Sequence, residues 1–452
     1  MTDRALWLAL TSGLLAACTS TTSLTDPELA NAAQAGKGSA QYELANRLAA
    51  KPDYPEAMRW MKQAADGGMF GASQATRAKA ALQVGQWYDA GLGEPKNPVL
   101  ANAWWRKASR LGSGAADYQL GLACQANHGG KVVAICIDHF ESAAKRGEAN
   151  AQQVLASWYA SKPEQAKEAT AWFAKAAAQG NRDAQYELAR RYELGEGGPK
   201  VPAEAERWYA KAAAQKQPDA LLWMARQSQG DEAIGYYQQA AHADAVEAQL
   251  WLARAYLSGE GMTRDESMGR YWLERAATQG SHEAEYQLSL QQTESQRRLH
   301  YLQLAAAGGV ARAQYGLATW LQEQGDDPQA RQWLAKAAAQ GLPEAQFAYG
   351  EMLRWGQGGK ENYAEAFRHY RLAAATGNRM AQYRMGTMRE EGLGAPRNRL
   401  HAYAWYALAA TEGMEEAQKA REELEGEMKS DEIKKAQQLA QHWFKRLPDD
   451  AS

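Results

Sequence analysis

The cysteines are the most reactive side chains of this 452-residue chain, and only three are present, Cys18, Cys124 and Cys136. They are too few for a four-cysteine zinc site, and no histidine stands at zinc-ligand spacing from them, so we expect no metal centre. Two interpretations of Cys124 and Cys136 stay open. They pair as a disulfide in an oxidising compartment, or they remain two buried thiols, because free cysteine is common in protein cores.

The remaining residue types give no pattern that would support catalysis. The eight histidines form no His-Glu-x-x-His motif, and we interpret His369 and His401 as structural. The run Gly129-Gly130-Lys131 lacks the earlier glycine and the following Ser or Thr of a phosphate-binding loop. No Gly-x-Ser-x-Gly nucleophile elbow occurs. We therefore expect a protein that is not an enzyme and that uses no cofactor.

The N-terminus has the features of a targeting segment. Residues 6–17 are apolar but too few to span a membrane, and Arg4 precedes them. The segment ends in Leu15-Ala16-Ala17-Cys18, with small residues where a signal peptide is cleaved. These four residues resemble the bacterial lipobox, which implies that Cys18 is lipidated and becomes the new N-terminus. A plain signal peptide followed by a chance cysteine is the alternative.

Lipidation of Cys18 would add several acyl chains, which is enough for stable membrane anchoring. Thr19 and the Ser/Thr residues after it indicate a flexible tether. Under the sorting rule of bacterial lipoproteins, the absence of Asp after the cysteine resembles outer-membrane targeting. We therefore expect an anchor in the outer membrane, with the chain on its periplasmic face.

The composition favours an all-α protein and argues against nucleic acid as a partner. Ala, Gln, Glu, Leu and Arg dominate, and these are strong helix formers. The formal net charge is only −2, whereas a nucleic-acid binder would show a basic excess. The chain has 16 Trp and 21 Tyr against six Phe, and such amphipathic aromatics suit a thin core that often reaches the surface.

A repeated unit fills most of the chain. Its first helix begins Ala-Gln-aromatic, as at residues 184–186, 345–347 and 381–383, and the last two copies are 36 residues apart. Apolar residues at the first, fifth and ninth positions make one stripe on that helix. A Gly-x-Gly loop then ends the helix, and a second helix carries Ala, an aromatic residue and Ala-Ala. Since one unit cannot bury its own stripe, neighbouring units must stack.

These residues resemble the Sel-like repeat, a relative of the tetratricopeptide repeat, over about eleven units. The resemblance implies a right-handed superhelical solenoid of antiparallel helix pairs. Units ending near residues 147, 180, 243, 309 and 341 lack the full Gly-x-Gly loop, so we expect a locally altered superhelix pitch or shorter helices in the middle of the array. The expected domains are a signal peptide at 1–17, a lipidated cysteine and tether at 18–30, a repeat solenoid at 31–425 and a C-terminal capping helix at 426–452.

The candidate partner-binding residues follow from tetratricopeptide geometry. Trp355 occupies the eleventh position of a late unit, preceded by Arg354, and exposed Trp beside Arg is typical of interface hot spots. Arg190 and Arg254 share the seventh position and are predicted to line the same groove. The structural alternative for all four is packing against a neighbouring unit or simple solvation.

The combination of lipobox, Ser/Thr tether, Trp-rich irregular repeats and terminal helix resembles the outer-membrane lipoproteins of alginate export. This resemblance implies a scaffold that joins an outer-membrane β-barrel exporter to a periplasmic alginate-modifying protein and protects the polymer in transit. A Sel-like lipoprotein serving another envelope assembly or signalling pathway is the alternative. An enzyme of the kind proposed for cysteine-rich Sel-like proteins is disfavoured, because those relatives carry a cysteine pair in most repeats.

Overall fold

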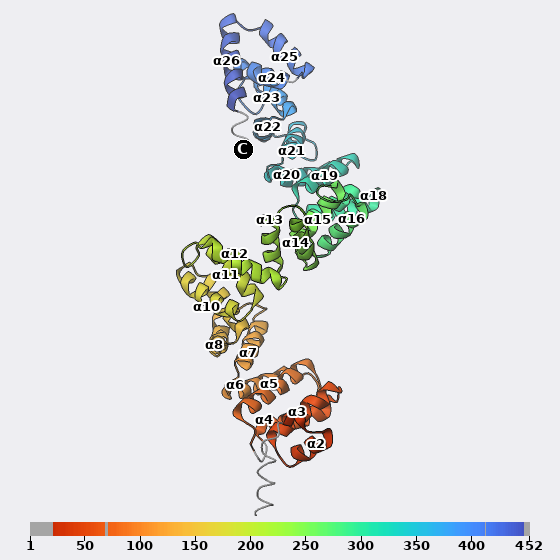
Figure 1. Ribbon diagram of the computed structural model, residues 1–452. Coiled ribbons are helices and arrows are strands. Elements are labelled where there is room, and N and C mark those ends of the chain that lie inside the picture. Colours follow the sequence, from red (N-terminus) through yellow and green to blue (C-terminus); the bar gives the residue numbers. More distant parts are fainter. Residues whose placement is uncertain (1–20, 68–70, 412, 447–452) are drawn as a thin grey trace, which may run out of the picture. The chain divides into compact units, whose positions relative to one another are not determined.

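The computed structural model describes residues 21–67, 71–411 and 413–446, and they form α-helices joined by short loops (Figure 1). Within these residues there are 25 α-helices, two short 3-10 helices at Thr21–Ser23 and Pro163–Gln165, and no strand. The all-α prediction is therefore confirmed. The chain divides into two compact units, Met1–Ala243 and Asp244–Ser452. None of the helices in the described residues is both long and apolar enough to cross a membrane.

The first unit holds helices α2 to α14. Their bounds are α2 Asp26–Gln34, α3 Gly38–Ala50, α4 Tyr54–Asp66, α5 Gln74–Ala90, α6 Pro98–Arg110, α7 Gly114–Asn127, α8 Ala134–Lys145, α9 Ala149–Ala160, α10 Ala166–Ala178, α11 Arg182–Leu194, α12 Pro202–Ala214, α13 Pro218–Gln227 and α14 Gly230–His242.

The second unit holds helices α15 to α26. Their bounds are α15 Val246–Ser258, α16 Glu266–Thr278, α17 His282–Gln291, α18 Ser295–Ala307, α19 Ala311–Glu323, α20 Asp327–Ala339, α21 Pro343–Trp355, α22 Tyr363–Ala375, α23 Arg379–Glu391, α24 Arg399–Ala410, α25 Glu415–Gly426 and α26 Ser430–Arg446. From α3/α4 to α23/α24, consecutive helices pack in pairs, each pair being one repeat. We call the first helix of a pair the A helix and the second the B helix.

The pair α11/α12 shows why this sequence folds in this way. The side chain of Asn181 accepts a hydrogen bond from the Ala184 amide at 2.8 Å and so caps the start of α11. Ala184 and Leu188 are fully buried along the stripe predicted for the A helix. On α12 the small residues let the two helices approach closely, and Tyr209 fills the space that remains.

A buried glutamine follows the first alanine of most A helices. Gln185 Nε2 donates to the Ala177 carbonyl at 3.2 Å, and Gln185 Oε1 accepts from Gln215 Nε2 at 2.8 Å. The amide therefore bonds to the B helices on either side of its own A helix, and satisfying both of its polar ends makes its burial tolerable. The same bond to the preceding helix is made by Gln41, Gln152, Gln314 and Gln382.

In the Gly-x-Gly loops at residues 91–93, 195–197, 356–358 and 392–394, the second glycine packs against the start of the preceding B helix. A Cβ placed on Gly394 would lie 2.1 Å from the carbonyl oxygen of Tyr363, the first residue of α22. The corresponding clash at Gly358 is with the Asp327 carbonyl, 2.3 Å away, at the start of α20. Each loop therefore fixes its own repeat on the one before it.

Two A helices are short, which confirms the prediction for the middle of the array. α13 and α17 have 10 residues each, whereas most A helices have 13. Both belong to units without the Gly-x-Gly loop, and only Gln292 to Glu294 join α17 to α18. The missing loop does not shorten the A helix in every such unit, since α7, α9 and α19 have 14, 12 and 13 residues.

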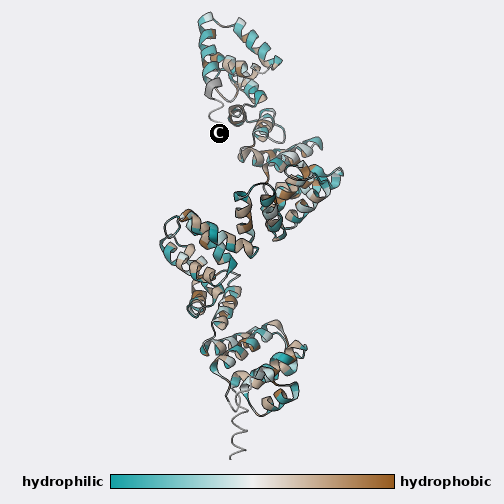
Figure 2. Ribbon diagram, viewed as in Figure 1, coloured by the Kyte–Doolittle hydropathy of each residue, from teal (hydrophilic) through white to brown (hydrophobic). Residues whose placement is uncertain are grey.

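The chain continues beyond the last repeat as two helices, α25 and α26, that are largely hydrophilic (Figure 2). Both pack against α24. On α26, Ala436 and Ala440 are buried, and Trp443 lies 4.7 Å from Trp405 between ring centroids. The segment expected to cap the array thus covers the outer side of α24.

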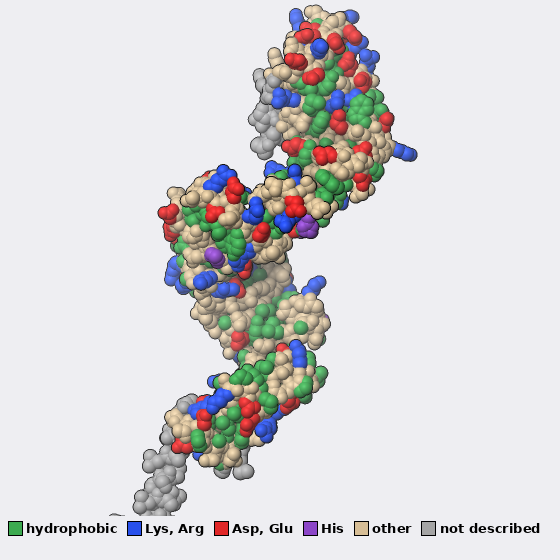
Figure 3. Space-filling model, turned by 90° about the vertical axis from the view of Figure 1, so that its right-hand side faces the viewer, with side chains coloured by type: hydrophobic (Ala, Val, Ile, Leu, Met, Phe, Trp, Pro, Cys, Tyr) green, Lys and Arg blue, Asp and Glu red, His purple; other side chains and the backbone are tan. Residues whose placement is uncertain are grey.

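On the face of the molecule seen in Figure 3, Lys and Arg side chains alternate with Asp and Glu, and hydrophobic side chains lie among them. No large area of that face carries one sign of charge. This mixed surface matches the near-neutral composition and gives no general attraction for a polyanion.

Candidate functional site

Trp355 is the last residue of α21, and its side chain is 57% exposed. Gly356 follows in the left-handed conformation with φ of 65° and ends the helix, so the indole stands at the corner where the chain turns. An exposed Trp presents a large rigid surface to a partner. The structure therefore leaves Trp355 accessible, as the sequence suggested.

Arg354 is not the exposed neighbour of Trp355 that the sequence predicted. It is only 8% exposed, and its guanidinium reaches Thr387 Oγ1 and Glu391 Oε2, both at 3.4 Å. Both partners lie on α23, the A helix of the next repeat. Since this helix position faces the following repeat, Arg354 joins two repeats and offers no free surface.

Arg190 and Arg254 lie in different compact units and differ in their surroundings. Arg190 belongs to the first unit and pairs with Glu187 and Glu196, both at 3.2 Å. Arg254 belongs to the second unit, is exposed, and has no side-chain partner among the described residues. It lines a hollow of about 380 Å³ between α15 and α17, together with Leu250, Glu283 and Gln287. Of the three arginines predicted from the sequence, Arg254 is therefore the one whose guanidinium remains free to meet a ligand.

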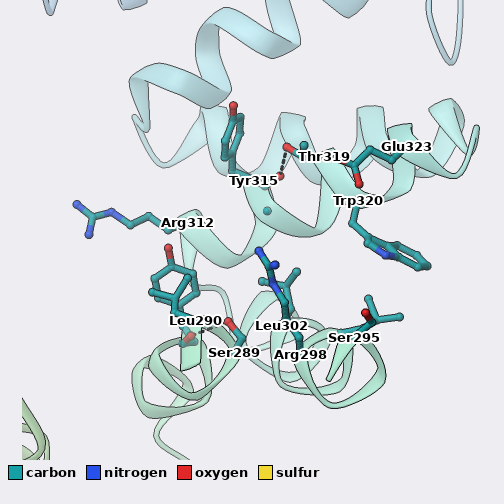
Figure 4. A pocket seen from close by; sticks show the side chains of 13 residues that line it. Ser289, Leu290, Ser295, Arg298, Leu302, Arg312, Tyr315, Thr319, Trp320 and Glu323 are labelled. Atoms are coloured by element: carbon teal, nitrogen blue, oxygen red, sulfur yellow. Dashed lines mark hydrogen bonds between the residues drawn. The ribbon is translucent and has the colours of Figure 1, made fainter. Parts of the chain in front are cut away.

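A larger hollow, of about 570 Å³, lies between α17, α18 and α19 (Figure 4). We call it the α17–α19 pocket. Tyr286 and Leu290 of α17, Arg298 and Leu302 of α18 and Trp320 of α19 line it. Figure 4 shows Arg298 rising from α18 toward α19, between Leu290 on one side and Trp320 on the other. The volume falls in the range of about 300–1,000 Å³ that is usual for ligand sites.

The pocket exists because its repeat is incomplete. α17 stops at Gln291, about one turn earlier than a full A helix, so the end of that helix leaves a gap beside α18. On the opposite side of the pocket, Gly316 of α19 has no side chain to fill the space, and a Cβ there would already contact Leu302 at 3.4 Å. The gap is therefore built by a short helix and by a residue without a side chain.

Arg298 occupies a position that is small in every other B helix of the array. Each B helix carries an Ala-Ala pair near its end, or Ala-Ser in α6, and has a large residue three positions before that pair, which in α18 is Leu302. Arg298 lies four residues, or about one helical turn, before Leu302, and we compare the residues at this position in the other B helices. The equivalent residues are Ala57, Ala101, Cys136, Ala169, Ala205, Ala233, Gly269, Ala330, Ala366 and Ala402. All but Ala233 are buried, whereas Arg298 is exposed in the pocket. The sequence contains this signal, but it is visible only when the B helices are aligned with one another.

The charges in the α17–α19 pocket are not neutralised by one another. Among the described residues, neither Arg298 nor Arg312 makes a hydrogen bond or ion pair through its guanidinium. Glu323, at the end of α19, is also exposed and unpaired there. Arg312 points away from the centre of the hollow in Figure 4. The pocket thus presents one inward guanidinium over apolar and aromatic walls.

The next repeats show the opposite arrangement, in which ionisable groups are fully paired. Arg384 donates two hydrogen bonds to the Glu351 carboxylate, at 2.8 and 3.0 Å, and Tyr370 Oη also donates to it. Burial alone would raise the pKa of Glu351, but the bonds from Arg384 and Tyr370 hold it below its ordinary value. Burial and the adjacent carboxylate raise the pKa of Tyr370. This cluster is structural and joins α21 to α22 and α23.

The cysteines of the first unit are close to a histidine, contrary to the prediction. Cys124 and Cys136 form a disulfide that joins the end of α7 to the start of α8. His128 Nδ1 lies 3.9 Å from the Cys124 sulfur and 4.0 Å from the Cys136 sulfur. The expectation that no histidine accompanies these cysteines is therefore wrong, because His128 follows Cys124 by about one helical turn and the disulfide brings Cys136 to the same place. Cys18 lies outside the described residues.

Solved structures of helical repeat proteins are similar to this chain. The crystal structure of c5321, a protective antigen present in uropathogenic Escherichia coli strains displaying an SLR fold, is 26% identical with a TM-score of 0.73, and the match covers 95% of this chain and 96% of that chain. A Sel1 repeat protein from Oxalobacter formigenes is 24% identical over 81% of this chain and 90% of that chain, with a TM-score of 0.32. No curated protein matches significantly.

A repeat family is matched at nine places along the chain. The Sel1 repeat matches residues 38–69, 78–113, 151–181, 182–216, 226–244, 246–281, 311–342, 343–378 and 379–414. These segments make up more than half of the chain, and eight of them each cover one helix pair, whereas 226–244 covers α14 and only the end of α13. The chain therefore belongs to the Sel1 repeat family.

Proposed function

We propose that this Sel1-repeat chain is a lipid-anchored scaffold that assembles an exopolysaccharide secretion complex through protein–protein contacts, without catalysis of its own. Repeat arrays of this kind present extended surfaces for other proteins. The exposed indole of Trp355 is the observation that carries the proposal, because the other large residues of α21 are buried or partly buried within the array.

The finer part of the proposal comes from the resemblance to AlgK, the outer-membrane lipoprotein of alginate export. Its supports are the sequence Leu15-Ala16-Ala17-Cys18, the Ser/Thr tether and the irregular, Trp-rich repeats. On this proposal Cys18 anchors the chain to the outer membrane. The repeats then hold an AlgE-like β-barrel exporter near an AlgX-like periplasmic protein that modifies alginate.

Recovery of partners from envelope membranes tests the docking surface. A tagged full-length chain should recover the exporter and the polymer-modifying protein, and Trp355→Ala should reduce that recovery. Tyr271→Ala is the matched control, because Tyr271 is also an exposed aromatic residue, 45% accessible, but lies on a B helix. Equal recovery by wild type and Trp355→Ala would refute this docking surface.

The anchor is tested separately by fractionation. Cys18→Ser should move the chain from the membrane fraction to the soluble periplasmic fraction, since one signal of anchoring is lost. A variant that remains in the outer membrane would contradict lipidation at Cys18. The two experiments are independent, because partner recovery can be measured with either form of the chain.

A further inference from the structure

The α17–α19 pocket differs from the rest of the array in a way that packing does not explain. Its repeat has an arginine, Arg298, where the equivalent B-helix positions have small residues. A small residue there would also fit, because the guanidinium supports no neighbour in the described structure. The guanidinium therefore makes no polar contact that the fold requires, and it is available to a ligand.

The chemistry of the pocket selects a carboxylate. An arginine guanidinium presents several donors in a fixed plane that matches the two oxygens of a carboxylate. Such a bond is strengthened when apolar surroundings exclude water. Leu290, Leu302 and Trp320 line the pocket beside the accessible Arg298 side chain, and a bound segment that covers them would exclude water from the bond.

The same walls indicate that the carboxylate belongs to a peptide. Leu290 is 56% exposed at the edge of the pocket, and with Tyr286 it offers an apolar surface next to the guanidinium. A peptide can place an apolar side chain beside an acidic one. A polyuronate, by contrast, carries a charge on every sugar and has no apolar side chain to place against Leu290 and Tyr286.

We propose that the α17–α19 pocket binds an acidic segment of a partner protein, with Arg298 holding a carboxylate and the apolar walls holding a neighbouring Leu- or Phe-like side chain. Arg312 at the rim meets a second acidic residue of the same segment. This proposal rests on the proposed function as a protein-binding scaffold and names the chemistry of one partner segment.

Fluorescence anisotropy with the full-length chain tests the proposal. The probe is a short fluorescein-labelled peptide of mixed Glu and Leu, and its twin has Gln in place of Glu. Arg298→Ala should weaken binding of the Glu/Leu peptide by about 10- to 100-fold, the range for a hydrogen bond to a charged group. It should leave the weak binding of the Gln/Leu twin unchanged.

Two further variants separate the pocket from general charge and from misfolding. Arg297→Ala is the matched control, because Arg297 is the neighbouring exposed arginine on α18 and pairs with Glu294. It should change the affinity by less than about twofold. Gly316→Leu fills the pocket without changing its charge and should weaken both peptides. Arg298→Ala itself restores the usual residue of the repeat, so its melting temperature should not fall.

Three results would overturn the proposal. They are equal losses with Arg297→Ala and Arg298→Ala, tighter binding of an oligouronate than of the Glu/Leu peptide, and no binding of the acidic peptide at all. The membrane recovery experiment keeps the two proposals distinguishable. Peptide failure with partner recovery intact would remove only this inference, whereas loss of partner recovery with peptide binding intact would remove only the proposed secretion complex.

Discussion

Replacing Gly394 with alanine tests how the repeats are held in register. Gly394 is the second glycine of the loop between α23 and α24, and its φ of 66° lies in the left-handed region. A methyl group there would stand 2.1 Å from the carbonyl oxygen of Tyr363. Because that oxygen belongs to the backbone at the start of α22, no side-chain rotation can relieve the contact.

The expected loss can be worked out against a matched glycine. Gly377, which follows α22, has φ of 87°, and a methyl group on it would meet no atom within 4 Å, so Gly377→Ala carries only the backbone strain. That strain is roughly 1–2 kcal/mol for a left-handed residue with a side chain. Gly394→Ala adds an overpacking term of about 1–3 kcal/mol. Its total destabilisation should therefore be about 2–5 kcal/mol, the sum of the strain and overpacking terms.

Urea-induced unfolding of the full-length chain, followed by circular dichroism, measures both variants. Because repeat arrays can unfold in stages, hydrogen exchange of the α22 to α24 amides should accompany it. Gly394→Ala should speed exchange at the start of α22 more than Gly377→Ala does. If the two variants lose the same stability and exchange alike, the loop does not fix its repeat on the preceding one.

Other perturbations separate surface from core and examine the disulfide and a buried histidine. Trp355→Ala should lower the free energy of unfolding in urea by less than about 1 kcal/mol. Leu353 is 1% exposed, and Leu353→Ala should lower it by about 2–5 kcal/mol. Similar losses for the two variants would place Trp355 in the core. The Cys124–Cys136 disulfide closes a loop with a sequence separation of 12 residues, so its reduction by a phosphine should lower the free energy of unfolding by about 3 kcal/mol. The melting temperature should fall with it, and an unchanged melting temperature would contradict this expectation. Burial and a neighbouring arginine lower the pKa of His369 from 6.5. The neutral imidazole therefore stabilises the folded protein fully above pH 6.5, and the free energy of unfolding should decline as the pH falls below that value. The decline should be smaller in His369→Gln, and identical pH profiles of unfolding for the two proteins would refute this role of His369.

The candidate site was only partly predictable, and the residues show why. The period of the repeat places Trp355 at the end of its helix, and this position is exposed. The same period places Arg354 one residue earlier, but whether that side chain meets water depends on the next repeat, where α23 brings Thr387 and Glu391 within reach. A helical pattern defines the faces of one helix, and the neighbouring repeat decides which faces are covered.

The position of His128 was missed although it is local. His128 follows Cys124 by four residues, about one helical turn at the end of α7, and the disulfide places the Cys136 sulfur beside the same ring. Arg298 is an intermediate case. Alignment of the B helices reveals it as an exception, but only the shortened α17 shows that the exception opens a pocket.

The sequence by itself determined the repeat, its two helices and the glycine loops between them, because these depend on local preferences and on one apolar stripe per helix. It also indicated where units would be short. Only the tertiary structure decided which arginines are buried between repeats and which remain free in a hollow. The physical reason is that burial of a long side chain depends on the stacking of the next unit, and a single missing helical turn is enough to change it.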